Sequence, residues 1–512
     1  MSKDGSYRQI LRSSSIIGGA SVINVAVGLL RIKVAAVLLG PAGVGLIGLL
    51  TNLAGTASAV AGLGVGNVGT RQIAEAVGRD DAAAIAAARR ALFWGSLVLA
   101  LLGAVVFWSL RGVLAVRVLG DAALAGEVGW LALVVGLTVA AASQTALLNG
   151  MRQIGDLARV SVLSAMLSTL LGIGALMLWG RGGLVAFLIA APLASFLLGH
   201  VYVARLPKIQ ASPTPLPVLA AQWRVLAKLG AAFMVAGLAV TLGQLLVRAL
   251  VQRQLGADAL GYFQAAATIS MTYIGFVLTA MGTDYYPRLT AAIHDHAAVN
   301  RMVNEQTEVA LLLAGPVLLA MMGLAPWVIE LLYSQSFYPA AEVLRWQVLG
   351  DILKVVSWPL GFIILAAGNG RTFMLTETLA ISVFVGLTWF GLPLIGVTAS
   401  GLAFFGMYVA YLPLVFWLAR RRTEFKWTTS IWWHMGLLFA MCILVKAVAM
   451  WSVGVGASIS ILVTLFWTAH AMTRLSRMSG IGGPIAHLLS SIPATNKFDE
   501  KKSKHESNDR KT

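Results

Sequence analysis

Two arginines lie inside apolar stretches of this sequence, where a charged side chain is energetically costly. Arg31 lies nine residues before Gly40, and Arg248 lies eight residues before Gly256. A charged side chain at the centre of a bilayer costs roughly 2.5–3.5 kcal/mol on insertion scales. Guanidinium groups bind phosphate well. The two arginines therefore predict a cationic cavity for an anionic group, and the alternative is that both side chains snorkel to lipid headgroups.

Uncharged polar side chains accompany these arginines at helical spacing. Asn24 precedes Arg31 by seven residues and Gln244 precedes Arg248 by four, so each pair shares one helix face. The apolar stretches that follow carry more amides and hydroxyls, which can bond sugars or simply hold membrane helices together. The predicted substrate-binding residues are Asn24, Arg31, Asn52, Thr56, Gln244, Arg248, Thr268 and Thr272.

A second group of ionisable residues lies in later apolar stretches. Asp351 and Lys354 are three positions apart, which permits an ion pair on one helix face. Glu377 has no cation next to it within its helix. We predict that these three residues take part in ion coupling, with Glu377 as the protonatable group. The alternatives for Glu377 are snorkelling and pairing with Arg371.

Catalytic, metal and nucleotide motifs give no support for an enzyme. Residues 64–69 match the pattern G-x-G-x-x-G but lie in an apolar helix with no preceding strand, so close helix packing or a kink is expected. The run His294, Asp295, His296 has no further ligand cluster. No Walker, zinc or Ser-His-Asp pattern occurs. We expect no catalytic residue, no metal and no cofactor.

The composition defines the class of protein. Of the 512 residues 58% are hydrophobic and only 12% are charged, with a mean hydropathy of +0.82. A soluble fold needs more charge on its surface, so a soluble enzyme, a nucleic-acid binder and a disordered protein are excluded. Apolar runs of about 20 residues recur along the chain and can cross a bilayer as helices. The sequence predicts an all-α polytopic membrane protein.

Fourteen membrane helices would position the polar residues. We predict them at 13–39, 43–68, 91–110, 128–149, 160–179, 183–204, 230–254, 260–284, 309–333, 345–367, 373–392, 395–418, 431–451 and 453–472. With the N-terminus inside, 28 of the 38 Lys and Arg lie in inner segments and four lie in outer ones. This bias favours cytoplasmic termini and accounts for the net charge of +17 without a nucleic-acid partner.

The two halves of the chain resemble each other. Gly40 and Gly256 end the first and seventh predicted helices, at an offset of 216 in the numbering. Residues 149–152 and 369–371 share Asn, Gly and Arg at offsets of 219 or 220. Six helices in each half make the repeat parallel, about an axis along the membrane normal, and transporters built this way place their site between the halves.

The repeat divides the chain into five parts. We predict an N-terminal six-helix bundle (1–204), a cytoplasmic linker (205–229), a C-terminal six-helix bundle (230–420), two additional helices (421–472) and a basic, partly disordered cytoplasmic tail (473–512). The linker region carries four prolines and no acidic residue, and residues 222–228 within it are predicted to form a short amphipathic stretch on the inner surface.

Residues 28–45, with the run Leu-Gly-Pro-Ala-Gly-Val-Gly, and the run Thr-Arg-Gln-Ile-Ala at 70–74 resemble Wzx-type oligosaccharide flippases. These belong to the multidrug/oligosaccharidyl-lipid/polysaccharide exporter superfamily and include O-antigen and lipid III translocases. The resemblance covers residues 10–420. It implies two six-helix bundles in a V, alternating access, and a polyprenyl-pyrophosphate-linked oligosaccharide moved from the inner to the outer leaflet of the bacterial plasma membrane. Expected partners are this substrate, membrane lipids, a polysaccharide polymerase and a chain-length regulator, with the chain a monomer.

Three other functions compete with this interpretation. A multidrug or cation antiporter of the same superfamily would need acids on the first or seventh helix, and neither carries one within the bilayer. A lipid II flippase would suit fourteen helices, but the charged signatures that we associate with it on the first two helices are absent. A membrane polymerase or ligase would need a large outer loop, and no predicted outer loop of this sequence is long enough.

Overall fold

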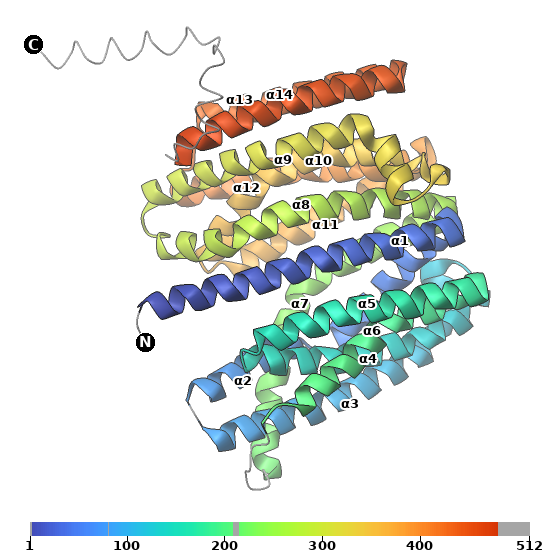
Figure 1. The fold of residues 1–512 in the computed structure, drawn as a ribbon, viewed down its shortest axis with the longest axis vertical. Helices are drawn as coiled ribbons and strands as arrows, with labels where there is room; N and C mark the ends of the chain where they lie inside the picture. The colour runs from blue at the N-terminus through green and yellow to red at the C-terminus, as the bar shows by residue number, and fades with distance from the viewer. Residues whose placement is uncertain (1–2, 80, 208–214, 480–512) are drawn as a thin grey trace, which may run out of the picture.

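Helices make up the described structure. The computed structural model describes residues 3–79, 81–207 and 215–479, and it contains no strand in that part of the chain (Figure 1). Ten helical stretches among these residues are long and apolar enough to cross a membrane. The prediction of an all-α polytopic membrane protein is confirmed. Most of the predicted tail lies outside the described residues.

The first half of the chain forms one bundle. Its helices are α1 (Lys3–Ala61), α2 (Val65–Gly78), α3 (Ala82–Leu114), α4 (Ala125–Gly150), α5 (Ile154–Trp179) and α6 (Leu184–Ala204). Gly40 divides α1 into two segments, because its φ of 65° and ψ of −169° are not helical. Pro41 then opens the second segment, where its fixed φ and missing N–H suit a first turn.

The second half forms an equivalent bundle with two more helices. These are α7 (Leu216–Leu255), α8 (Ala257–Ala291), α9 (His296–Leu332), α10 (Ala340–Ala366), α11 (Gly370–Ile395), α12 (Thr398–Thr423), α13 (Thr429–Trp451) and α14 (Val453–Ser479). Residues 216–229 of the predicted linker are the first turns of α7, so this helix begins earlier than the predicted residue 230. Trp223 Nε1 donates to the Ala91 carbonyl at 2.8 Å, and this contact with α3 stabilises the helical extension.

The predicted helix at 43–68 contains a break. The chain is helical to Ala61 and again from Val65, with Leu63 and Gly64 at positive φ. A Cβ on Gly230 of α7 would contact the Leu63 carbonyl oxygen, so α7 packs directly against this bend. The glycine pattern at 64–69 therefore marks a kink with close helix packing, as predicted.

Backbone turns repeat between the two bundles at a constant offset of 216. Gly40 and Gly256, which are related by this offset, have φ of 65° and 87°. Gly180 and Gly396 have the same offset and end α5 and α11 with φ of 54° and 61°. Helix pairings repeat too: α3 packs on α4 and α5 on α6, as α9 packs on α10 and α11 on α12. The predicted parallel repeat is confirmed.

One predicted match within the repeat is displaced. The N–H of Arg152 donates to Asn149 O, and the N–H of Gly368 donates to Leu365 O in a turn with the same hydrogen-bond pattern. Arg152 and Gly368 both have positive φ and are again related by the offset of 216. The Asn, Gly and Arg matches at offsets of 219 and 220 are therefore wrong as structural equivalents. The turn requires a positive φ at one position, and it does not require the same residue type there in both halves.

Both described ends of the chain lie at one end of the molecule. α1 begins there and α14 ends there (Figure 1), and we call this end the terminal face. The opposite end, with the turns at Gly40 and Gly256, is the distal face. Asp81 and Asp295 cap α3 and α9 at the terminal face, each accepting a hydrogen bond from a backbone N–H three residues on. The Asp between the two histidines is thus a helix cap.

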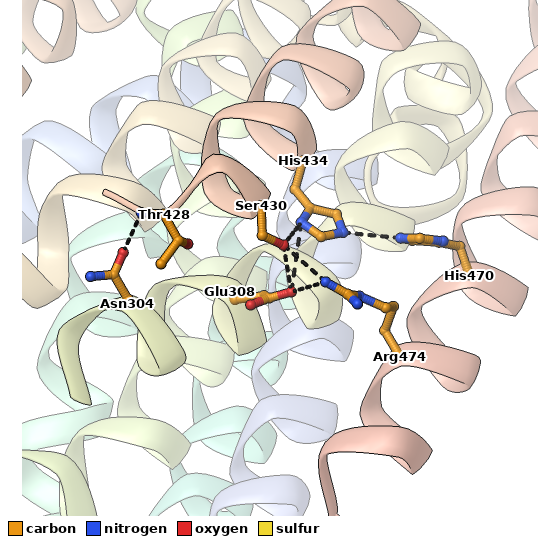
Figure 2. Close-up of polar contacts among 7 residues, drawn as sticks. All are labelled: Asn304, Glu308, Thr428, Ser430, His434, His470 and Arg474. Atoms are coloured by element: carbon orange, nitrogen blue, oxygen red, sulfur yellow. Dashed lines mark hydrogen bonds and ion pairs between the residues drawn. The ribbon is translucent and has the colours of Figure 1, made fainter. Parts of the chain in front are cut away.

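A polar cluster fastens α13 and α14 to α9 (Figure 2). Glu308 Oε1 accepts from Ser430 Oγ at 2.8 Å and from Arg474 Nη2 at 3.0 Å. Ser430 Oγ lies 3.2 Å from His434 Nδ1, and His434 Nε2 lies 3.0 Å from His470 Nε2. One proton shared between the facing imidazole nitrogens satisfies both rings. The two additional helices and the C-terminal bundle therefore share one hydrogen-bonded network.

Close packing and an ion pair complete this attachment. Trp467 of α14 is fully buried against Gly315 of α9, which has no side chain to displace it. Lys446 Nζ of α13 pairs with Glu342 Oε1 of α10 at 2.6 Å. This ion pair ties α13 to α10.

Candidate functional site

A cavity lies between the two bundles, and we call it the inter-bundle cleft. It has a volume of about 450 Å³ and is lined by residues of α1, α7 and α8 and by Tyr333. Its polar lining residues are Thr51, Asn52, Thr56, Thr241, Arg248, Gln264, Thr268 and Tyr333. Hydroxyl and amide groups beside one guanidinium suit a ligand that combines an anionic group with neutral hydroxyls.

Arg248 is fixed by its neighbours on α7 and α8. Its Nε donates to Gln264 Oε1 at 3.0 Å, and its Nη1 donates to the Gln244 carbonyl at 3.1 Å. The guanidinium lies 5.7 Å from the centre of the Phe263 ring. Nη2 has no hydrogen-bond partner among the described residues. Only 6% of Arg248 is exposed, so this nitrogen belongs to a largely desolvated cation that favours an anionic ligand.

A second cavity lies inside the C-terminal bundle, and we call it the C-bundle cavity. It has a volume of about 630 Å³ and shares Arg248 with the inter-bundle cleft. Its charged lining residues are Arg248, Lys354 and Glu377, and its aromatic ones are Phe263, Trp358, Phe362, Phe373, Phe384, Phe404, Tyr408 and Tyr411. Glu377 Oε1 accepts a hydrogen bond from Tyr411 at 2.6 Å. Arg248 therefore stands between a neutral polar cleft and a chamber that contains a carboxylate.

Asp351 lies next to this cavity and is completely buried. Its Oδ2 accepts from Ser270 Oγ at 2.7 Å and from the Tyr273 hydroxyl at 2.8 Å. Its Oδ1 has no partner among the described residues. The predicted Asp351–Lys354 ion pair is wrong, because α8 supplies hydroxyl donors to the carboxylate and Lys354 lines the cavity instead. A proton or cation on the unpartnered oxygen would relieve the cost of this buried carboxylate.

The two bundles meet tightly at the distal face, where α1 crosses α8. A Cβ on Gly45 would lie 2.6 Å from the Ala257 carbonyl oxygen, and a Cβ on Gly261 would contact the Pro41 carbonyl oxygen. Residues 257 and 261 correspond to residues 41 and 45 at the offset of 216, so equivalent positions face one another across the repeat axis. Glycine is required at both, because any side chain would strike backbone.

Two basic side chains bridge the bundles beside this crossing. Lys33 Nζ donates to the Glu330 carbonyl at the end of α9, at 2.8 Å. Arg253 Nη1 donates to the Arg117 carbonyl in the π-helical turn after α3, at 3.2 Å. Since α9 is the equivalent of α3, each bundle gives a cation to the carbonyls at a helix end of the other. We call these two contacts the distal latches. Neither side chain snorkels in this structure.

Arg31 lines neither cavity. Its Nη2 donates to the Phe187 carbonyl at 2.6 Å, and its guanidinium lies 4.1 Å from the centre of the Phe187 ring. At the offset of 216 the equivalent of Arg248 is Ile32, which does line the inter-bundle cleft. One residue turns a helix by about 100°, so Arg31 faces α6. The sequence pairing of Arg31 with Arg248 is out of register by one residue.

The other predicted residues divide between the cavities and local contacts. Those that line the inter-bundle cleft are Asn52, Thr56, Arg248 and Thr268, and Gln244 lines the C-bundle cavity. Asn24 donates to Ser161 Oγ on α5, and Thr272 donates to the Thr268 carbonyl. Four polar residues of the inter-bundle cleft are absent from the predicted set: Thr51, Thr241, Gln264 and Tyr333. Gln264 belongs to the polar face of its helix, whereas only the fold brings Tyr333 to the cleft.

Comparison with known proteins agrees with this architecture. A solved structure of a lipid II flippase, MurJ, in an inward closed conformation matches with a TM-score of 0.68 and 13% identity, over 91% of this chain and 99% of that one. An inward-facing multidrug resistance MATE family transporter of the MOP superfamily matches with a TM-score of 0.65 and 18% identity, over 78% of this chain and 94% of that one. The chain thus has the fold of these helical transporters.

The sequence comparison identifies the family. A family profile described as polysaccharide biosynthesis protein matches residues 34–342, more than half of the chain. The chain belongs to this family. The lipid III flippase of Escherichia coli strain K12 is 24% identical over 425 residues, which cover 81% of this chain and 99% of that protein.

Proposed function

We propose that this protein is a flippase that moves a polyprenyl-pyrophosphate-linked oligosaccharide, such as an O-antigen or related repeat unit, across the bacterial plasma membrane by alternating access. The observation that carries the proposal is the inter-bundle cleft, which places one desolvated arginine among hydroxyls and amides and ends at a tight distal helix crossing. Arg248 would bind the pyrophosphate, and the neutral groups would bond sugars. The similarity to a lipid III flippase and the family membership support the same substrate class.

Charge favours outward movement of such a substrate. The bias of Lys and Arg toward the terminal face supports a cytoplasmic location for that face and for both termini. A pyrophosphate carries about two negative charges, and each is moved outward with a gain of about 2.3 kcal/mol per 100 mV of inside-negative potential. Membrane potential therefore contributes to the driving force. Asp351 and Glu377, with Lys354 beside them, are the groups that would add coupling to a proton or cation.

The domain division fits rocking of two units. We propose that the N-terminal bundle forms one unit, and that α8–α12 together with α13 and α14 form the other, with α7 spanning both. Substrate would enter from the cytoplasmic leaflet in the state described here, with the distal face closed. A polysaccharide polymerase and a chain-length regulator would act on the product outside, and the chain would work as a monomer.

A flipping assay tests the proposal directly. The purified full chain is reconstituted into proteoliposomes with a fluorescent undecaprenyl-pyrophosphate-linked oligosaccharide, and a membrane-impermeant enzyme or quencher reports the label that reaches the opposite leaflet. The proposal requires faster transfer than in protein-free vesicles and slower transfer with Arg248→Gln. Transfer that is no faster than in protein-free vesicles would refute it.

A cation antiporter is the second candidate, because Glu377 and Asp351 lie at the C-bundle cavity and carboxylates bind cations. Efflux of a fluorescent organic cation from the same vesicles, without transfer of the lipid-linked oligosaccharide, would favour it. The match to a lipid II flippase over 91% of the chain makes lipid II the natural competing substrate in the flipping assay.

A further inference from the structure

Gln264 and Gly48 occupy equivalent positions in the two bundles and meet where α1 crosses α8. They are related by the offset of 216, like Gly45 and Gly261 one turn away. A Cβ on Gly48 would overlap the Gln264 side chain, with Gln264 Cγ only 2.6 Å away. Two long side chains cannot both fit at such a crossing. The N-terminal bundle therefore contributes the space and the C-terminal bundle contributes the amide.

Both ends of the Gln264 amide are used. Its Oε1 accepts from Arg248 Nε at 3.0 Å, and its Nε2 donates to Thr268 Oγ1 at 3.0 Å. The Nη1 of Arg248 is held by the Gln244 carbonyl within α7. Gln264 thus fixes the guanidinium plane from α8, and Nη2 remains the edge without a partner among the described residues. Pre-organised donors bind an anion at lower entropic cost than mobile ones.

We propose that Gln264 is the positioning residue for Arg248, and that this positioning depends on closure of the distal face. The dependence arises because the Gln264 side chain occupies the space that Gly48 leaves free where α1 crosses α8. While α1 and α8 are packed together, Gln264 is confined and Arg248 is set for an anion. When the two helices separate, Gly48 no longer packs against Gln264. The Gln264 side chain then becomes mobile, and the guanidinium plane of Arg248 is no longer fixed. The inference rests on the proposed function and adds to it a reason for release: affinity for the pyrophosphate group falls as the distal face opens. By linkage, a bound pyrophosphate favours the closed distal face.

Binding of farnesyl pyrophosphate to the purified full chain, measured by isothermal titration calorimetry with farnesol as the neutral control, tests the proposal. Gln264→Ala is expected to raise Kd about tenfold, because one hydrogen bond that orients a charged group is lost. Gly48→Ala, whose methyl displaces the amide, is expected to raise Kd several-fold. Gly275→Ala is the matched control: Gly275 lies on α8 like Gln264 but lines neither cavity, and its Cβ would meet nothing within 4 Å.

A double-mutant cycle separates positioning from simple damage. In the Gln264→Ala background, Gly48→Ala has no side chain to displace and should leave Kd unchanged. Gly45→Ala, whose methyl strikes backbone and pushes α1 from α8, should likewise raise Kd only when Gln264 is present. In the flipping assay, Gln264→Ala should raise the half-saturating substrate concentration without lowering the maximal rate, a separation that a general structural defect would not produce.

The outcomes distinguish the two proposals. If the wild-type chain binds farnesyl pyrophosphate no better than farnesol, the proposed function fails. If it binds the pyrophosphate but Gln264→Ala has the same Kd as Gly275→Ala, the positioning role is refuted while the proposed function stands. If the effects of Gly48→Ala and Gln264→Ala add, the dependence on the helix crossing is refuted.

Discussion

The register of the repeat gives a sharp prediction about two arginines. Arg248→Gln removes a guanidinium that is 6% exposed and lines the inter-bundle cleft, whereas Arg31→Gln removes one that is bound to Phe187 on α6. A hydrogen bond to a charged group contributes about 1.5–3 kcal/mol, so Arg248→Gln should weaken binding of a prenyl pyrophosphate about 10- to 150-fold. Arg31→Gln should change Kd by less than about twofold, because its guanidinium does not reach the ligand.

Arg31→Gln should instead lower the thermal stability of the protein. Loss of the bond to the Phe187 carbonyl and of the ring contact should lower the unfolding free energy by about 1–2 kcal/mol. Calorimetric titration with farnesyl pyrophosphate and a melting curve of the detergent-solubilised protein measure the two effects. Equal losses of affinity in both variants would refute the register argument, and so would a normal affinity in Arg248→Gln.

Three further predictions concern closure and attachment. Gly45→Ala should open the distal face, because its Cβ would lie 2.6 Å from the Ala257 carbonyl oxygen. Lys33→Ala removes one distal latch, worth about 1 kcal/mol, and should shift the closed-to-open ratio about fivefold toward the open state. Glu308→Gln leaves Arg474 without its counter-ion and should lower the unfolding free energy by about 1–3 kcal/mol, measured by thermal melting, with little effect on Kd.

A cysteine reporter measures distal opening. Thr51→Cys places a thiol in the inter-bundle cleft, and the single native Cys442 is fully buried and should not react. A membrane-impermeant maleimide added outside intact cells should label Thr51→Cys faster when Gly45→Ala or Lys33→Ala is also present. Unchanged labelling in both would show that these contacts do not hold the distal face closed. Gly275→Ala again serves as the control, since it lines neither cavity and its added methyl meets nothing within 4 Å.

The sequence by itself determined the class of structure. Apolar runs long enough to span a bilayer define helices without reference to neighbours, because a bilayer forces backbone hydrogen bonds to be local. The turn glycines Gly40 and Gly256 revealed the parallel repeat, since a positive φ is a local demand that glycine meets. The polar stripes around Asn52 and Arg248 were visible for the same reason: helical period relates spacing to a face.

Tertiary structure decided which polar faces meet. The offset of 216 from Gly40 to Gly256 aligns Arg248 with Ile32, whereas Arg31 and Arg248 were paired only because they lie at similar depths in their helices. A difference of one residue turns a side chain by about 100°, and only the packing shows that Arg31 faces α6. The distal latch from Lys33 to Glu330 joins residues 297 positions apart, and Gln264 meets Gly48 only because equivalent helices cross at the repeat axis. Helical spacing defines a face on one helix, but only the packing of many helices determines what that face touches.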